Sequence, residues 1–148
     1  MDNSIDLREE RKHGAFTELY RASGLEIDDG WEAECNPLFS VSAREGDRLL
    51  GAATVSRRFG RLVLDYIAVW PGFRVKGIGR QLAACCADYA RKQGADKLWL
   101  AARTPDFFRA LGAAETGGEE LLAECLVCPD YGKECSPLEM VINISDKE

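Results

Sequence analysis

Residues 69–82, VWPGFRVKGIGRQL, constrain the fold of this chain more than any other stretch. An apolar strand candidate, residues 62–69, runs into them, and an amphipathic helix candidate, residues 77–93, runs out. A strand, a glycine-bearing turn and a helix start form an anion site, because the first N–H groups of a helix have no intrahelical partner. The turn is basic in a chain of net charge -6, which indicates a phosphate-bearing ligand. Its cations are Arg74, Lys76 and Arg80.

The turn carries the pattern Arg74-x-x-Gly77-x-Gly79. Residues 64–71, LDYIAVWP, precede it, and residues 107–114, FFRALGAA, follow downstream. These three segments resemble the signature segments of the GCN5-related N-acetyltransferase (GNAT) superfamily, and the resemblance extends over about residues 38–117. It implies the acyl-CoA N-acyltransferase fold, an α/β fold whose mixed, mostly antiparallel twisted sheet is flanked by helices on both faces.

Hydrophobic periodicity and turn residues predict the other elements. Gly46-Asp47 predicts a hairpin, and the helix between strands 62–69 and 97–102 predicts that these two strands are parallel. With 148 residues and no linker, the chain is predicted to be a single GNAT domain, residues 1–148. The expected strands are 4–8, 38–45, 49–59, 62–69, 97–102, 119–127 and 138–144, and the expected helices are 10–23, 77–93 and 106–111.

Composition excludes several classes of protein. The chain is 46% apolar and 30% charged, as soluble globular proteins are. No apolar run is long enough to span a bilayer, and the N-terminus MDNSIDLREERK has no signal-peptide core, so we expect a cytoplasmic protein without a membrane partner. The acidic balance argues against nucleic-acid binding and suits a cationic, amine-bearing substrate.

The resemblance implies acetyl-CoA as co-substrate. The diphosphate would lie on the backbone amides of residues 74–79, and the pantetheine arm would enter a splayed gap between strands 62–69 and 97–102. The residues that the resemblance assigns to the cofactor are Ile67, Ala68, Val69, Arg74, Val75, Lys76, Gly77, Ile78, Gly79, Arg80 and Phe108.

Acetyl transfer needs a deprotonated amine and a polarised thioester carbonyl. Backbone N–H groups at a bulge within residues 65–69 would polarise the carbonyl. Asp65 is the first candidate for the base, and a strand acid that is solvated or paired to an arginine is the alternative. Glu32 is the runner-up, together with Glu26 and Glu34. These belong to the acidic segment 25–37, which by resemblance lines the acceptor pocket and otherwise is an ordinary exposed loop.

Phe108 departs from the family, which often has a tyrosine here to protonate the leaving thiolate. Phenylalanine has no proton to donate. Three alternatives stay open: the thiolate leaves unassisted, Tyr131 or a cysteine substitutes, or the protein binds the cofactor without ordinary catalysis.

The pattern Cys125-x-x-Cys128 followed by Cys135 is the least expected feature. Two thiolates at this spacing bind one Zn²⁺, and Cys35 would complete a tetrahedral set. By resemblance, the segments that carry these cysteines both flank the acceptor pocket, which predicts a structural zinc site. Redox-active thiols and scattered structural cysteines are the alternatives.

The sequence therefore predicts an N-acetyltransferase that acetylates a primary amine of a small molecule, peptide or protein. Two alternatives use the same fold: a non-catalytic acyl-CoA-binding protein and a metal- or thiol-responsive regulator. Because family members often dimerise through their last strands, a homodimer is the partner that the resemblance implies.

Overall fold

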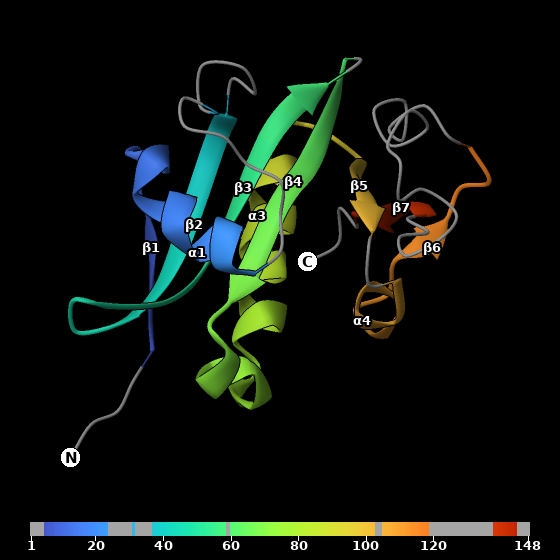
Figure 1. The fold of residues 1–148 in the computed structure, drawn as a ribbon. Coiled ribbons are helices and arrows are strands. Elements are labelled where there is room, and N and C mark those ends of the chain that lie inside the picture. Colours follow the sequence, from blue (N-terminus) through green and yellow to red (C-terminus); the bar gives the residue numbers. More distant parts are fainter. Residues whose placement is uncertain are drawn as a thin grey trace.

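The computed structural model describes residues 5–23, 31, 37–58, 60–102, 105–118 and 138–144, with backbone alone at 74–76. A twisted seven-stranded sheet has the order β1-β2-β3-β4-β5-β7-β6, with α1 on one face and α3 on the other (Figure 1). The strands are β1 (Asp6–Glu9), β2 (Pro37–Glu45), β3 (Arg48–Arg58), β4 (Arg61–Val69), β5 (Lys97–Ala102), β6 (Ala114–Glu115) and β7 (Leu138–Asn143). The helices are η1 (His13–Phe16), α1 (Thr17–Ala22), η2 (Pro71–Lys76), α3 (Ile78–Lys92) and α4 (Pro105–Ala110), where η marks a 3₁₀ helix.

The sheet is mixed and mostly antiparallel, as predicted. Strands β1 to β4 pair antiparallel in chain order, and β7 pairs antiparallel with both β5 and β6. Only β4 and β5 are parallel among the described strands, because α3 carries the chain from the end of one back to the start of the other. Gly46 forms the predicted hairpin turn with a φ of 64°, a conformation that glycine adopts without strain.

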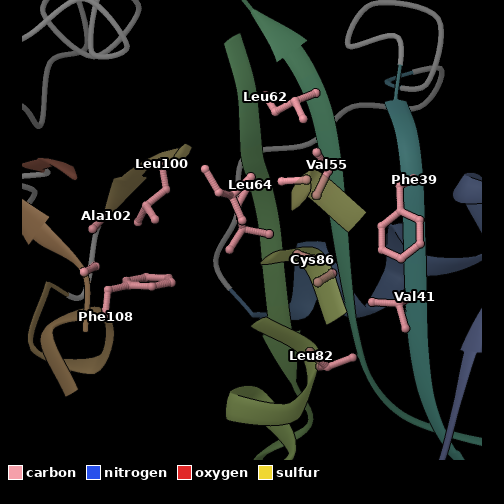
Figure 2. Close-up of a cluster of buried hydrophobic side chains, with 14 of the residues drawn as sticks. Phe39, Val41, Val55, Leu62, Leu64, Leu82, Cys86, Leu100, Ala102 and Phe108 are labelled. Atoms are coloured by element: carbon pink, nitrogen blue, oxygen red, sulfur yellow. The ribbon is translucent and has the colours of Figure 1, made fainter. Parts of the chain in front are cut away.

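Two hydrophobic cores lie on opposite faces of the sheet. The larger one joins the sheet to α3 and α4, and Figure 2 shows Val55, Leu64, Leu82 and Phe108 within it. The smaller one lies under α1 and is largely aromatic. Its buried residues are Phe16, Leu19, Tyr20, Trp31, Ala52 and Ala68.

Helix α3 matches its prediction closely. Gly77 precedes it with a φ of 76°, and Gly94 follows it with a φ of 84°. Two cysteines of α3 lie on its sheet side, where Cys86 is fully buried and Cys85 partly so. Burial raises the pKa of the Cys86 thiol, so Cys86 is a packing residue with little thiolate character.

One predicted helix differs from the structure, and one short strand was not predicted. The helix predicted at 10–23 begins later, because the Glu10 N–H donates to the Ser40 carbonyl at 2.9 Å and so extends the sheet edge. The following turn, which contains Gly14, is 3₁₀ rather than α-helical. The short strand β6, which pairs with β7, was not predicted, and the predicted strand 119–127 lies outside the described residues. No helix in the described part of the chain is long and apolar enough to cross a membrane.

Candidate active site on strands β4 and β5

A bulge interrupts β4 at Asp65. Thr54 of β3 pairs with Tyr66, and the next residue, Val55, pairs with Leu64, so Asp65 is the extra residue. The bulge shifts the strand's alternation by one. Leu64 before it and Val69 after it both pack into the α3 core, although they are five residues apart. This confirms the predicted irregularity within residues 65–69.

Strands β4 and β5 separate beyond their single shared register position. Val63 pairs with Trp99, and the described residues show no further β4–β5 pair. β5 instead pairs with β7 along its whole length, and Figure 1 shows it set apart from β4. The edge of β4 after the bulge is therefore outside the ladder with β5, which leaves main-chain N–H and C=O groups directed toward the gap.

The start of α3 lies directly after β4 and is suited to an anion. A hydrogen bond from the Gln81 N–H to the Gly77 carbonyl at 3.1 Å begins the helical ladder, so the amides of residues 78–80 precede it. No acidic residue occupies the first turn of α3, and Arg80 is exposed there. A bound anion would gain from both the N–H groups and the helix dipole.

Gly79 permits a close contact between α3 and α4. A Cβ at this position would lie 2.9 Å from Cζ of Phe107 and 3.9 Å from Cγ2 of Val69. The Phe107 ring, 39% exposed, therefore lies against the helix start and the end of β4. Phe107 was not among the predicted site residues, although its position beside Phe108 in the FFRALG segment is the signal that would have found it.

Phe108 points into the core. Its side chain is 6% exposed and packs with the α3 cluster (Figure 2). Its ring centroid is 4.9 Å from that of Phe107. The assignment of Phe108 to the cofactor stays a prediction, because its described contacts are with the core.

Asp65 is paired with an arginine that sequence reasoning did not identify. Arg58 Nε lies 2.9 Å from Asp65 Oδ1, and the two side chains are 31% and 8% exposed. The pair lies on the α1 face, where burial raises the pKa of Tyr20 above its ordinary 10.0 and the Asp65 charge adds to the shift. The arginine-paired alternative for Asp65 is thus observed, and its role as base stays a prediction.

An aromatic cluster adjoins this ion pair. Tyr66 stacks on Tyr20 with a centroid distance of 5.1 Å, and Trp31 meets Tyr66 edge-on at 5.2 Å. The Trp31 Nε1–H donates to Thr17 Oγ1 at 2.8 Å, which fixes the indole against α1. Trp31 comes from the segment predicted to line the acceptor pocket; Glu32, Glu26 and Glu34 of that segment lie outside the described residues.

A second buried carboxylate lies on β7, which is separated from β4 by β5. Glu139 of β7 is 5% exposed, and Thr116 Oγ1 donates to its carboxylate. Its neighbour Met140 packs into the α3 core, so strand alternation directs Glu139 to the α1 face. Glu139 was not predicted, because nothing in the sequence indicates that an isolated acid in a short apolar strand is buried.

A separate groove of about 530 Å³ lies between α3 and strands β1 and β2. Phe39 and Tyr89, whose rings stack at 4.5 Å, form part of its wall together with Cys85. It lies beside β1 and β2, whereas the splayed strands are β4 and β5. We therefore do not assign it to the cofactor.

The predicted zinc ligands Cys35, Cys125, Cys128 and Cys135 lie outside the described residues. Within the described ranges, no group of three or more His, Cys, Asp or Glu residues is placed to hold a metal ion. The zinc site stays a sequence prediction.

A bulged strand, a parallel neighbour that diverges from it and a glycine-flanked helix start between them form one site. The model of the acetyltransferase (GNAT) family matches residues 5–116, three quarters of the chain. The chain belongs to the GNAT acetyltransferase family. The matched range includes β4, β5 and α3, and so confirms the resemblance that the Arg74-x-x-Gly77-x-Gly79 pattern carried.

Known proteins similar to this GNAT chain include both a curated relative and solved structures. Streptothricin acetyltransferase of Streptomyces lavendulae is 45% identical over 81 residues, which are 53% of this chain and 42% of that protein. The match thus spans less than half of the curated relative's length.

Two solved structures share the fold. N-acetylglutamate synthase of Neisseria gonorrhoeae, complexed with coenzyme A and N-acetyl-glutamate, has a TM-score of 0.76 at 17% identity, covering 98% of this chain and 36% of that one. Nourseothricin acetyltransferase has a TM-score of 0.67 at 20% identity, covering 95% and 99%.

Proposed function

We propose that this GNAT protein transfers an acetyl group from acetyl-CoA to a primary amine. The divergence of β4 and β5 after Val63↔Trp99, directly beside a helix start without acidic residues, is the observation that carries the proposal. A gap between parallel strands suits an extended thioester arm, and the helix start suits its diphosphate.

The cofactor would be held mainly by the backbone. The diphosphate would accept hydrogen bonds from the amides of the 74–79 turn and the start of α3, with Arg74, Lys76 and Arg80 supplying positive charge. The pantetheine arm would lie along Ile67, Ala68 and Val69, the part of β4 that β5 does not pair.

The chemistry would take place at the bulge. The neutral amine nitrogen attacks the thioester carbonyl carbon, and β4 N–H groups beyond Asp65 would stabilise the resulting oxyanion. Collapse of the tetrahedral intermediate breaks the C–S bond, and the thiolate takes up a proton. Asp65 or Glu32 would remove the amine proton, directly or through water.

The acceptor that we propose to test first is streptothricin. Its support is the 45% identity over 81 residues to streptothricin acetyltransferase. The net charge of -6 favours a cationic acceptor in general, and the acidic segment 25–37 would supply local attraction.

A second candidate function, acyl-CoA binding without transfer, is favoured by one observation. Phe108 is buried and has no proton to donate to a leaving thiolate. One experiment separates the two: protein, acetyl-CoA and streptothricin are mixed, and thiol release and acetylated product are quantified. Transfer predicts one thiol per acetylated amine. Binding without transfer predicts no thiol release with streptothricin, L-lysine or spermidine.

The zinc site and a cytoplasmic location are separate proposals from the sequence. Metal analysis of protein purified without chelator tests the first. One zinc per chain, lost when Cys125 and Cys128 are changed to serine, would support it and would favour a metal-dependent regulatory role. A protein without zinc would leave the four cysteines as thiols.

A further inference from the structure

Ser56 of β3 carries a buried hydroxyl for which the proposed mechanism has no use. The residue is 0% exposed, and its Oγ has no hydrogen-bond partner among the described residues. Burying a hydroxyl without a partner forfeits its hydrogen bonds to water. A buried hydroxyl without a partner is rare in native proteins, and a role in binding a ligand would explain it.

The other buried hydroxyls that β2 and β3 carry on the same face have hydrogen-bond partners. Ser40 Oγ lies 2.6 Å from His13 Nδ1 and 2.8 Å from Thr54 Oγ1, and Thr54 Oγ1 lies 2.8 Å from the Tyr20 hydroxyl. Ser42 Oγ donates to the carboxylate of Glu10. Among the buried hydroxyls that β2 and β3 direct to the α1 face, Ser56 therefore is the exception in the described part of the chain. Ser23 Oγ, at the end of α1, also has no partner there.

Strand register locates Ser56 beside the bulge. Val55 packs into the α3 core, so alternation directs Ser56 to the α1 face. Ser56 pairs with Val63, two residues before Asp65, and Arg58, two residues further along the same face of β3, makes the 2.9 Å ion pair with Asp65. An unpaired hydroxyl and a carboxylate thus lie at neighbouring positions of one sheet face.

We infer that Ser56 is an acceptor-binding residue, whose Oγ accepts a hydrogen bond from the acceptor's amino group while the Asp65 carboxylate balances its charge. The inference rests on the proposed acetyl transfer. A primary ammonium has three N–H donors, which can bind both a hydroxyl oxygen and a carboxylate oxygen. These two residues would hold the nitrogen at the bulge, where the thioester carbonyl is expected.

Arg58 would give way to the acceptor. Its guanidinium forms an ion pair with Asp65 in this structure, and the acceptor's ammonium would replace it in that pair. Arg58 is 31% exposed against 8% for Asp65, so solvent reaches the ion pair from the Arg58 side. A cationic acceptor arriving from that side would displace the guanidinium and reach Ser56 behind it.

Steady-state kinetics of Ser56→Ala and Ser56→Thr test the inference, with streptothricin, L-lysine and spermidine as acceptor probes. Losing one hydrogen bond to a charged group predicts that Ser56→Ala lowers kcat/KM for the acceptor about tenfold or more. The affinity for acetyl-CoA should stay unchanged. Ser56→Thr keeps the hydroxyl in a strand that accepts β-branched residues, and should recover most of the loss.

Ser40→Ala is the matched control. It removes a hydroxyl that is already paired, so it should lower the thermal unfolding midpoint and leave the acceptor KM unchanged. Ser56→Ala should not lower that midpoint, because no hydrogen bond of the free protein is lost.

Three outcomes overturn the inference. The first is an unchanged acceptor kcat/KM in Ser56→Ala while the wild type turns over. The second is a lower unfolding midpoint in Ser56→Ala with equal effects on both substrates, which would mark a structural hydroxyl satisfied by water. If the wild type acetylates none of the probes, the proposed function fails and the inference fails with it.

Discussion

Gly77 shows how one residue links backbone conformation to the proposed cofactor site. Its φ of 76° lies in the left-handed region, and a Cβ would have no atom within 4 Å. Any cost of a side chain here is therefore conformational rather than steric. The residue lets the chain leave η2 and enter α3 with its first amides directed outward.

We expect Gly77→Ala to lower the free energy of unfolding by about 1–2 kcal/mol, the cost of left-handed geometry for an L-residue. Gly77→Asn should cost less, because asparagine tolerates this region. Urea denaturation measures both. Gly72→Ala is the control, since it also faces open space but has no positive φ. Equal stability of all three variants would contradict the account.

The motif predicted the glycine turn and the start of the helix, but it did not predict the ion pair at the bulge. Gly77, Gly79 and Arg80 were predicted because glycine spacing is local in sequence. Arg58 was not, because it reaches Asp65 only through the β3–β4 register and its bulge. Pairings of this kind depend on tertiary geometry that residue spacing does not encode.

Strands β3 and β4 and helix α3 meet at Gly51, where there is no room for a side chain. A Cβ would lie 2.9 Å from the Ala68 carbonyl oxygen, 3.1 Å from Val69 Cγ2 and 3.2 Å from Leu82 Cδ1. Because the nearest atom belongs to the backbone of the neighbouring strand, relief requires the elements to move apart.

Gly51→Ala should therefore destabilise the protein by about 1–3 kcal/mol, the range for overpacking a filled core. Gly46→Ala is a comparison in open space, where only the φ of 64° contributes. Chemical denaturation compares the free energies of unfolding of the two variants. A Gly51→Ala variant as stable as the wild type would show that β4 and α3 are not held this closely.

Helix α4 offers a test of the missing proton donor. Phe108→Tyr restores the hydroxyl that the family often has, at a residue 6% exposed. We expect kcat for acetyl transfer to rise several-fold, with a stability cost of about 1–3 kcal/mol for the buried hydroxyl. Steady-state thiol release at saturating substrates measures the first effect and urea denaturation the second. An unchanged kcat would mean that thiolate protonation does not limit turnover or that another donor serves.

The order and type of most described elements followed from sequence. Strands 62–69 and 97–102 and helix 77–93 were predicted within one residue at each end, because strong apolar periodicity and flanking glycines define them. The two-residue strand β6 and the 3₁₀ turn of η1 were not, because pairing with β7 and the hydrogen bond between Glu10 and Ser40 form only in the folded sheet.

Among the described residues, Glu10 makes the stability of the whole molecule depend on pH in the acid range. Arg44 donates two hydrogen bonds to the Glu10 carboxylate, with Nε–Oε2 and Nη2–Oε1 distances of 2.7 and 3.1 Å, and Ser42 donates another. These bonds hold the pKa of Glu10 below its ordinary 4.5. A lowered folded-state pKa means that the unfolded chain binds more protons, so this stability is present above about pH 4.5 and is lost as the pH falls through the folded-state pKa.

Glu10→Gln should lower the free energy of unfolding by about 1–2 kcal/mol at pH 7, where the charged fork is intact. The difference from the wild type should shrink below pH 4.5. Urea denaturation of both proteins at several pH values gives the comparison. A difference that stays constant with pH would assign the effect to packing rather than to charge.

The most direct test of the central claim is a calorimetric titration of acetyl-CoA into the intact protein. We predict saturable one-site binding that Gly79→Leu abolishes, because the leucine would displace Phe107 and cover the start of α3. Gly46→Leu, at the β2–β3 turn where a Cβ would meet no atom within 4 Å, should bind as the wild type does, with circular dichroism confirming that both variants fold. No binding by the wild type, or undiminished binding by Gly79→Leu, would contradict the assignment of this site to acetyl-CoA.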